Sequence, residues 1–391
     1  MTILGIIAEY DPFHNGHLYH MTEAKKRIRP DFTYVVLSPC MKQRGTFSML
    51  SPLDRARLTL EAGADAVFSL PVLWTIRDAE HYALGAVSLL SRLGATHLAF
   101  GVETDDLPLL RHAADLLESP SAAFESRLKD VLSRGAGFPS ALSETMRTML
   151  PRASDLLDHP NNVLAVSYLR AIRRLNASIS PVPIRRTGNY HDSLIDPVSP
   201  SASALRGALL RGNYSEALAA MPPYAAALIR KRFLERRIPD PGIADTLLLS
   251  RLRSMSVSDY AQLPDVSEGL ENALRHASQS VTGRDELIGA LTGVRYPAAR
   301  ISRLCACALL QVTPEDIFSL SLPESALLLG LKKNPEMTAL WKDLPVPVVS
   351  SFTEWKKAAH PADLLAWRLW AQCCRLPDTL PFTEKTVSQS L

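Results

Sequence analysis

The sequence predicts an α/β protein with a doubly wound parallel sheet, followed by a helical C-terminal domain. Over the first half, short runs rich in β-branched and aromatic residues alternate with longer helical patterns, an order typical of parallel strands joined by crossover helices. From about residue 213 the strand pattern nearly disappears and helical runs dominate. With 391 residues the chain exceeds what one hydrophobic core usually organises, so two domains are expected.

The predicted elements of the first half follow one another in a regular order. Strands are expected at residues 3–9, 32–38, 66–71 and 96–101, and helices at 17–28, 54–62 and 81–93. Helices are also expected within 106–157, and residues 181–192 form a last strand that runs into a loop. Ligands of such sheets bind beyond the carboxyl ends of the strands, so the segments after Glu9, Ser38, Leu70 and Phe100 should converge.

A serine-rich segment at residues 199–212 leads into a helix, with Ser201 or Ser203 as candidate caps. We place the domain boundary near residue 211, which predicts an α/β domain at 1–211 and a helical domain at 212–391. Helical runs there include residues 285–291 and 299–311. The polar tail at 383–391 is expected to be frayed.

The amino-acid composition limits the classes of protein to which this chain can belong. The 43 Lys and Arg residues nearly balance the 40 Asp and Glu residues, so a nucleic-acid surface must be local. The five cysteines show neither a disulfide framework nor paired zinc-ligand spacing, which fits a reducing compartment. The first residues lack the features of a signal peptide, and no apolar stretch is long enough to span a membrane. These features predict a cytoplasmic protein without membrane contact.

The most informative segment is IAEYDPFHNGHLYH at residues 7–20, whose core is H-x-G-H. With 10 histidines and 18 glycines in the chain, chance produces this pattern in about one chain per hundred of this composition. The segment passes from a predicted strand through a proline-containing turn into a helix. This position lowers the risk of a chance match further.

The three defined residues of this pattern have a common physical interpretation. Their spacing places His14 and His17 on one face of the first helical turn, where their N–H groups can reach phosphate oxygens that gain charge. Gly16 removes a side chain where a nucleotide approaches, and the helix N-terminus attracts anions. The alternatives are surface histidines without a role or zinc ligands, but no acidic or cysteine ligand shares the spacing.

H-x-G-H after a first strand resembles the superfamily of class I aminoacyl-tRNA synthetases and of adenylyl- and cytidylyltransferases. The longer string GIIAEYDPFHNGHLYH resembles the tRNA(Met) cytidine acetate ligase family in particular. The same resemblance continues in KQRG at 42–45, FG at 100–101, PNNVLAVSYLRA at 160–171, PIRRTGNYHD at 183–192 and SASALR at 201–206, and more weakly in TGVRYPAARISRL at 292–304.

The resemblance implies an ATP-dependent ligase that forms acetyl-adenylate from acetate and ATP and transfers the acetyl group to N4 of the wobble cytidine of elongator tRNA(Met). It implies His14, His17 and Arg44 as catalytic residues, with magnesium accompanying ATP and no protein metal ligand assigned. The residues that the resemblance assigns to ATP binding are Ile7, Ala8, Glu9, Tyr10, Asp11, Pro12, Phe13, His14, Asn15, Gly16, His17, Leu18, Tyr19, His20, Gly101, Asn161, Asn162, Arg185, Arg186, Ser201, Ser203 and Arg206.

Several of these residues also have an ordinary structural interpretation. Arg44 follows the second strand and could neutralise a phosphate or acetate, although loop arginines are usually solvated; Lys42 beside it stays undecided. Gly101 either admits the adenosine or simply ends a strand. Asn161 and Asn162 follow Pro160 and either contact ATP or cap a helix.

For the remaining basic and hydroxyl residues, the sequence likewise allows either a binding role or an ordinary structural role. Arg185 and Arg186 bind phosphates or serve solubility at a strand end, and Ser201, Ser203 and Arg206 hold the triphosphate or only cap a helix. Tyr190, His191 and Asp192 form a polar cluster without an assigned role. In the second half, Arg295, Arg300 and Arg303 lie near one helical face with Tyr296 between them, which suggests contact with the tRNA backbone or a merely solvated face.

Two other functions compete with the ligase. One is a small-molecule adenylyltransferase of the same superfamily, but the long helical second half favours a macromolecular substrate. The other is a nucleotide- or RNA-binding protein without catalysis, against which the intact His14, Gly16 and His17 argue. The sequence contains no KMSKS-like string, which disfavours a synthetase.

Overall fold

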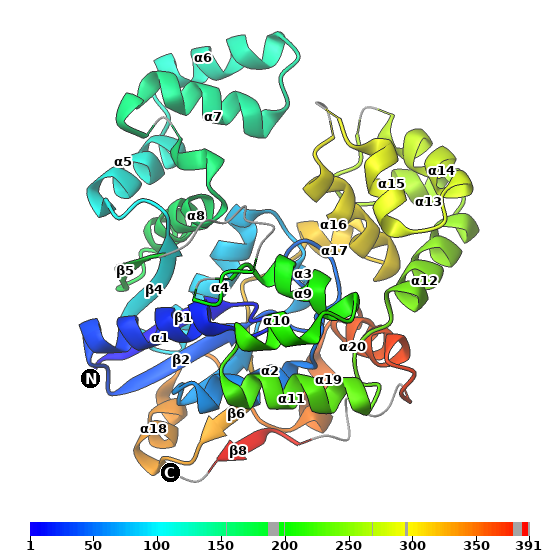
Figure 1. Cartoon of the computed structure of the whole chain (residues 1–391). Helices are drawn as coiled ribbons and strands as arrows, with labels where there is room; N and C mark the ends of the chain where they lie inside the picture. Colours follow the sequence, from blue (N-terminus) through cyan, green and yellow to red (C-terminus); the bar gives the residue numbers. More distant parts are fainter. Residues whose placement is uncertain are drawn as a thin grey trace.

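The computed structural model describes residues 1–153, 155–186, 195–198, 200–267, 269–293, 296–377 and 385–389. Its centre is one eight-stranded sheet, in which five strands of the first half lie parallel in the order β5-β4-β1-β2-β3 (Figure 1). These strands are β1 (Ile3–Ala8), β2 (Phe32–Leu37), β3 (Ala66–Ser69), β4 (His97–Val102) and β5 (Ser180–Arg185). The predicted doubly wound parallel sheet is confirmed.

The alternation of side chains along each strand divides the core between the two faces of the sheet. In β2, Val35 and Leu37 pack into one cluster with α1 and α2, whereas Tyr34 and Val36 pack into a second cluster with α4 and α8. Every residue of β2 is buried, as in a sheet covered by helices on both faces.

The helices of the first half cover these faces. They are α1 (Asn15–Ile28), α2 (Pro52–Glu61), α3 (Val72–Thr75), α4 (Ala79–Arg92), α5 (Leu107–Glu118), α6 (Ala122–Ser133), α7 (Phe138–Met149) and α8 (Pro160–Arg174). Helices α1, α2 and α4 each begin two residues before the predicted start, because the residue that caps each helix lies further upstream. Ser51 caps α2 and Asp78 caps α4 through side-chain oxygens that accept a backbone N–H. In Figure 1, α6 and α7 project beyond α5, away from the sheet.

The second half is mostly helical. It contains α9 (Ala202–Leu210), α10 (Tyr214–Ala219), α11 (Pro223–Leu234), α12 (Pro241–Ser254), α13 (Val257–Ala261), α14 (Leu270–Ser280), α15 (Arg284–Leu291), α16 (Ala298–Leu309), α17 (Pro314–Phe318), α18 (Pro335–Leu340), α19 (Phe352–Ala358) and α20 (Pro361–Cys373). Helices α12 to α16 share a hydrophobic core of their own, from Leu248 to Ala308. We call α12 to α16 the helical unit.

The end of the chain returns to the sheet. β6 (Ala326–Lys332) pairs antiparallel with β3, and β7 (Val348–Val349) and β8 (Val387–Gln389) pair with β6. The expectation of a frayed tail is therefore wrong for residues 387–389, because β6 offers them backbone partners. The division at residue 211 stays a prediction, since the second half also contributes to the core beneath the sheet.

None of the described helices combines the length and the apolar character needed to cross a lipid bilayer.

Candidate active site at the carboxyl end of strand β1

The turn after β1 carries the H-x-G-H pattern at the point where the strand order reverses. β1 lies between β2 and β4, and ligands of doubly wound sheets bind at this switch point. Tyr10 adopts a left-handed backbone with φ of 47°, and His14 is the N-cap of α1. The chain therefore turns sharply between strand and helix, which brings His14 and His17 to the carboxyl end of the sheet.

The rings of His14 and His17 stack on one another, with centroids 3.6 Å apart and an interplanar angle of 21°. The backbone N–H of His14 donates to Nδ1 of His17 at 3.3 Å, so a neutral His17 carries its proton on Nε2. Nδ1 of His14 and Nε2 of His20 are buried and have no hydrogen-bond partner in the described part of the chain. Such orphan nitrogens are typical of a site that a ligand completes.

All three histidines are held neutral. Burial lowers the pKa of His14 to about 3, and the positive charges of Arg186 and Arg206 act in the same direction. Burial likewise lowers the pKa of His20 to about 4, and the pKa of His17 lies well below its ordinary value because of burial and the neighbouring His14. The site therefore combines neutral imidazole donors with nearby guanidinium charge, a combination suited to a polyphosphate.

A buried ionic network lies directly behind the histidines. The carboxylate of Asp11 accepts from Nζ of Lys42 at 2.8 Å and from the backbone N–H of Met49 at 2.6 Å, and Arg206 lies 3.8 Å away. Burial raises the pKa of Asp11, but Lys42, Arg206 and Arg55 together hold it below its usual range. Lys42, which the sequence left undecided, is thus part of the site.

Sequence reasoning missed Arg55. This side chain is fully buried in α2 and donates to the carbonyl of Glu9 at 2.7 Å and to the carbonyl of Pro39. It ties the ends of β1 and β2 together. Nothing in the local pattern distinguishes it from a solvated helix arginine, because its partners come from two other segments.

The loop at residues 42–45 joins the site to the helical unit. The backbone N–H of Gln43 donates to the carboxylate of Glu9 at 2.7 Å. The carbonyl of Arg44 accepts from Ser302 of α16, whereas the Arg44 side chain is exposed. Gly45 has φ of +68°, and a Cβ there would lie 2.7 Å from the carbonyl of Ser302. The catalytic role expected for Arg44 remains a prediction.

Gly101, Arg185 and Arg186 lie on the other side of β1. Among the described residues, a Cβ on Gly101 would meet only the side chain of Arg186, at 3.7 Å. The charge of Arg186 lowers the pKa of His14, His17 and His20, whereas Arg185 is exposed at the end of β5. Of the two arginines, the structure brings Arg186 to the histidines.

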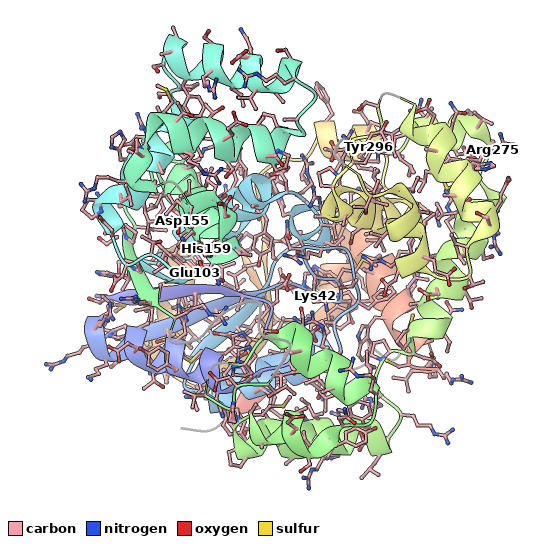
Figure 2. All side chains as sticks on the ribbon, turned by 45° about the horizontal axis from the view of Figure 1, so that its top comes forward. Lys42, Glu103, Asp155, His159, Arg275 and Tyr296 are labelled. Carbon is pink, nitrogen blue, oxygen red and sulfur yellow. The ribbon has the colours of Figure 1, made fainter. Side chains whose placement is uncertain are left out.

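The structure gives the two asparagines different surroundings. Asn162 is fully buried, and its Oδ1 accepts from the backbone N–H groups of Glu103 and Thr104 at 3.0 and 3.1 Å, so it fixes the loop after β4. Asn161 is partly exposed and donates to the Glu103 carboxylate at 2.5 Å. Figure 2 shows Glu103 near His159, apart from Lys42 in the centre of the view. Asn162 is therefore a structural anchor, and the ATP contact expected of one of the two asparagines stays a prediction.

The serine segment docks against the H-x-G-H turn. Ser201 caps α9 by accepting from the backbone N–H of Ala204 at 3.1 Å. Arg206 donates to the hydroxyl of Ser203 at 2.9 Å and to the carbonyl of Asp11. Ser201 is thus occupied in capping, and Arg206 and Ser203 lie at the site. The cluster Tyr190, His191 and Asp192 lies outside the described residues.

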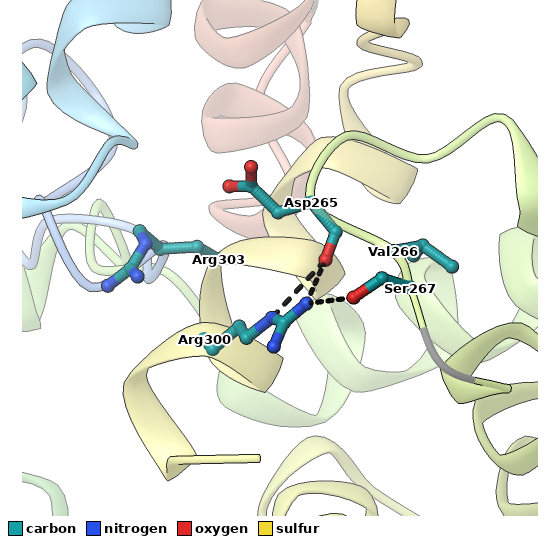
Figure 3. Close-up of a pocket in the computed structure, with 5 residues that line it drawn as sticks. All are labelled: Asp265, Val266, Ser267, Arg300 and Arg303. Carbon is teal, nitrogen blue, oxygen red and sulfur yellow. Dashed lines mark hydrogen bonds between the residues drawn. The ribbon is translucent and has the colours of Figure 1, made fainter. Parts of the chain in front are cut away.

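Arg300 and Arg303 lie three residues apart on α16, within one turn of the helix. Arg300 donates to the carbonyl of Asp265 at 2.6 and 3.2 Å and to Ser267 at 2.9 Å. Arg303 projects in another direction (Figure 3). Arg295 lies outside the described residues. The RNA contact expected of these arginines stays a prediction.

The described residues contain no group of three His, Cys, Asp or Glu side chains that could hold a metal ion. All five cysteines are buried and unpaired, and burial raises the pKa of Cys40 well above its ordinary value.

Comparisons with known proteins identify relatives over almost the whole chain. The HIGH nucleotidyl transferase family model matches residues 1–379. The tRNA(Met) cytidine acetate ligase of Kosmotoga olearia is 32% identical over 375 residues, which cover 93% of this chain and 88% of that protein. Two crystal structures of Thermotoga maritima TmcAL, one apo and one bound with alpha-thio ATP, superpose with TM-scores of 0.93 and 0.90, at 24% and 23% identity and over 100% of both chains.

Proposed function

Because the chain belongs to the HIGH nucleotidyl transferase family, and within it to the tRNA(Met) cytidine acetate ligases, we propose that it activates acetate with ATP and acetylates N4 of the wobble cytidine of elongator tRNA(Met). One observation at the site carries this proposal. At the switch point of the sheet, two stacked neutral histidines with an orphan buried nitrogen face a cluster of positive side chains.

In the first step, a carboxylate oxygen of acetate attacks the α-phosphorus of ATP. The bond to the pyrophosphate oxygen breaks, and acetyl-adenylate and pyrophosphate form. Negative charge grows on the phosphate oxygens, where His14 and His17 can donate hydrogen bonds. Arg186 and Arg206 supply positive charge beside them.

In the second step, the N4 amine of the cytidine attacks the acetyl carbonyl carbon of acetyl-adenylate. The bond between that carbon and the phosphate oxygen breaks, AMP departs, and the amine gives up one proton to solvent. The protein needs to hold the mixed anhydride and exclude water, and neither step requires a covalent enzyme intermediate.

Magnesium is proposed to accompany the triphosphate. Mg²⁺ at nucleotide sites is held largely by phosphate oxygens and water, with one or two carboxylates. Glu9 and Asp11 are the carboxylates of the turn, and both already accept hydrogen bonds from the protein. The residues therefore do not form a cage of their own, and no step is assigned to the metal.

The tRNA is proposed to approach from the side of the helical unit. The loop at 42–45 reaches from the nucleotide site to α16, so a large substrate bound there would lie beside the activated acetyl group. With ATP and tRNA as substrates, we place the reaction in the cytoplasm.

Acetate-dependent exchange of labelled pyrophosphate into ATP tests the first step, and mass spectrometry of tRNA nucleosides after incubation with labelled acetate tests the second. We expect both signals. Exchange that ignores acetate but responds to phosphopantetheine or nicotinamide mononucleotide would instead indicate a small-molecule adenylyltransferase. No exchange with any of them, in the presence or absence of tRNA, would indicate a binding protein.

A further inference from the structure

A pocket lies on the helical unit, apart from the histidines. Its volume is about 360 Å³, and Asp265, Val266, Ser267, Arg300 and Arg303 line it (Figure 3). A narrower recess beside it also reaches Ile76 and Arg77 of the first half. The volume lies at the lower end of the range of about 300 to 1,000 Å³ that small-molecule sites occupy.

The loop on one side of this pocket is held in a definite shape. Asp265 has a left-handed backbone with φ of 61°, which is uncommon for a residue other than glycine. The guanidinium of Arg300 fixes the loop by donating twice to the carbonyl of Asp265 and once to Ser267. Backbone strain of this kind is often retained at binding sites.

Two opposite charges line the pocket without pairing. Among the described residues, neither the carboxylate of Asp265 nor the guanidinium of Arg303 has a hydrogen bond or an ion-pair partner within 4 Å. Burial lowers the pKa of Arg303, although Asp78 and Asp265 favour its charged form. Arg303 is half-buried, so its guanidinium faces the open pocket, where a ligand with hydrogen-bond acceptors can replace water.

We propose that this pocket holds one unstacked base of the RNA substrate, beside the cytidine that is acetylated. A carboxylate accepts from an exocyclic amine, and a guanidinium donates to the ring nitrogen or carbonyl next to it. Cytosine, adenine and guanine present such a donor beside an acceptor, whereas uracil has carbonyl oxygens on both sides of its single N–H. Proteins commonly read single-stranded RNA loops through splayed bases of this kind.

The loop at 42–45 connects this pocket with the nucleotide site. Lys42 contacts Asp11 at the histidines, and the carbonyl of Arg44 accepts from Ser302, the residue before Arg303 on α16. An RNA strand whose base occupies the pocket would therefore pass the exposed Arg44 on its way to the acetyl group. The inference rests on the proposed ligase function and adds a recognition site to it.

The experiment measures acetyl transfer to anticodon stem-loop hairpins in a single turnover. The reacting cytidine is kept, and each other loop base is removed in turn to leave an abasic nucleotide. The variants are Asp265→Asn, which tolerates the left-handed backbone, Arg303→Gln, and Arg303→Lys, which keeps the charge without the planar fork. Arg275→Gln is the matched control, because this exposed arginine lies at the outer edge of the helical unit (Figure 2).

With the wild-type protein, one abasic position should lower the transfer rate roughly 5- to 100-fold. Arg303→Gln and Asp265→Asn should lower the rate similarly with intact RNA and should no longer respond to that abasic position. Arg303→Lys should recover only part of the loss. Pyrophosphate exchange, which does not use the pocket, should stay at the wild-type rate in every variant. If the wild-type protein showed no pyrophosphate exchange, that result would refute the proposed ligase function. It would not be the result that refutes the binding of a base in the pocket.

Three results would overturn the base-binding proposal. The first is that the loss of acetyl-transfer rate in Arg303→Gln adds to the loss caused by every abasic position, including the position to which the wild-type protein responds. The second is a uniform loss for all RNAs with a salt dependence about one log-log unit flatter, which would indicate a phosphate contact. The third is an equal effect in Arg275→Gln, which would indicate general charge.

Discussion

At the scale of single residues, we expect the imidazole of His17 to act as a neutral hydrogen-bond donor. Its Nδ1 already accepts from the backbone of His14, and burial keeps the ring uncharged. Its Nε2–H is then the group that can stabilise charge growing on the α-phosphate. Stacking on His14 fixes the direction of this donor.

Replacing His17 by alanine should lower acetate-dependent pyrophosphate exchange roughly 100- to 1,000-fold, the usual effect of losing one transition-state donor. The protein should still unfold cooperatively in urea, with a loss of roughly 0.5 to 3 kcal/mol from the ring contacts with Tyr10, Phe13 and His14. His112→Ala, on the exposed surface of α5, is the control and should leave exchange unchanged. Near-wild-type exchange in His17→Ala would refute the catalytic assignment.

The buried His14 should make the protein less stable in acid. Its folded pKa of about 3 lies below the ordinary value near 6.5, so the unfolded chain binds more protons between these values. Stability therefore rises with pH across this window, and His14 alone should cost about 2 kcal/mol on going from pH 7 to pH 5.

Urea unfolding of the wild type and of His14→Gln at pH 5, 6 and 7 tests this expectation. The variant should lose less stability than the wild type as the pH falls, by about that amount. Comparing the two proteins cancels the titration of groups that they share. If the free energy of unfolding of the two proteins changed equally with pH, the pKa of the buried His14 would not be lowered in the folded protein.

Cys40 lies close to the ends of the central strands but should not take part in the chemistry. Burial raises the pKa of its thiol well above the ordinary value, so little thiolate exists near neutral pH. Cys40→Ala should therefore retain pyrophosphate exchange and acetyl transfer within about twofold of the wild type. A large loss of exchange in a variant that still unfolds cooperatively would point to a covalent intermediate.

At the scale of elements, the contact between the loop at 42–45 and α16 depends on the absence of a side chain at Gly45. A Cβ at this position would lie 2.7 Å from the carbonyl of Ser302 and 2.8 Å from Cβ of Ala306. The same loop holds Lys42 against Asp11. Separating the loop from α16 should therefore disturb both the helical unit and the nucleotide site.

Gly45→Ala should lower the free energy of unfolding by more than Gly212→Ala. Both glycines have positive φ, of 68° and 84°, so both variants carry the backbone cost of roughly 1 kcal/mol. No described residue lies within 4 Å of a Cβ at Gly212, so the difference measures the clash with α16. Chemical denaturation of the two variants checks it. Equal losses of the free energy of unfolding in the two variants would show that the loop moves away from α16 at no energetic cost.

At the scale of the whole molecule, the end of the chain completes the core of the first half. β6 covers the edge of β3, and Trp370 of α20 donates from its indole N–H to the carbonyl of Ser48 at 2.8 Å. The carboxylate of Asp363 accepts from the backbone N–H of Val72 at 2.7 Å. These contacts are spread over the sheet and over the helices beneath it.

A fragment of residues 1–211 should therefore fail to fold cooperatively, although the sequence pattern changes near its end. It would expose the edge of β3 and the apolar surface that α20 covers. A chain ending at residue 377 keeps β6 and α20 and should still unfold cooperatively. Circular dichroism during thermal unfolding distinguishes the two. A fragment 1–211 that melts sharply and binds ATP would instead establish the first half as an independent domain.

Much of the site was predictable because its chemistry lies in one continuous segment. His14, Gly16 and His17 follow a recognisable strand, and their short spacing alone places them on one helical turn. The other contributors come from distant segments, so their roles depend on packing. Asn161 and Asn162 look alike in sequence, but burial beneath the loop after β4 makes only Asn162 a structural anchor.

By itself, the sequence determined the parallel doubly wound sheet, the position of the H-x-G-H turn at its carboxyl edge and the mostly helical second half. Periodicity and short-range spacing encode these features, because each depends on residues within one or two turns of chain. Only the tertiary structure decided that Lys42 and Arg55 belong to the site, that residues 387–389 form a strand, and that Arg300 and Arg303 point apart. Each of these depends on partners far away in sequence, such as Asp11 for Lys42 and Asp265 for Arg300, and no local pattern records such a contact.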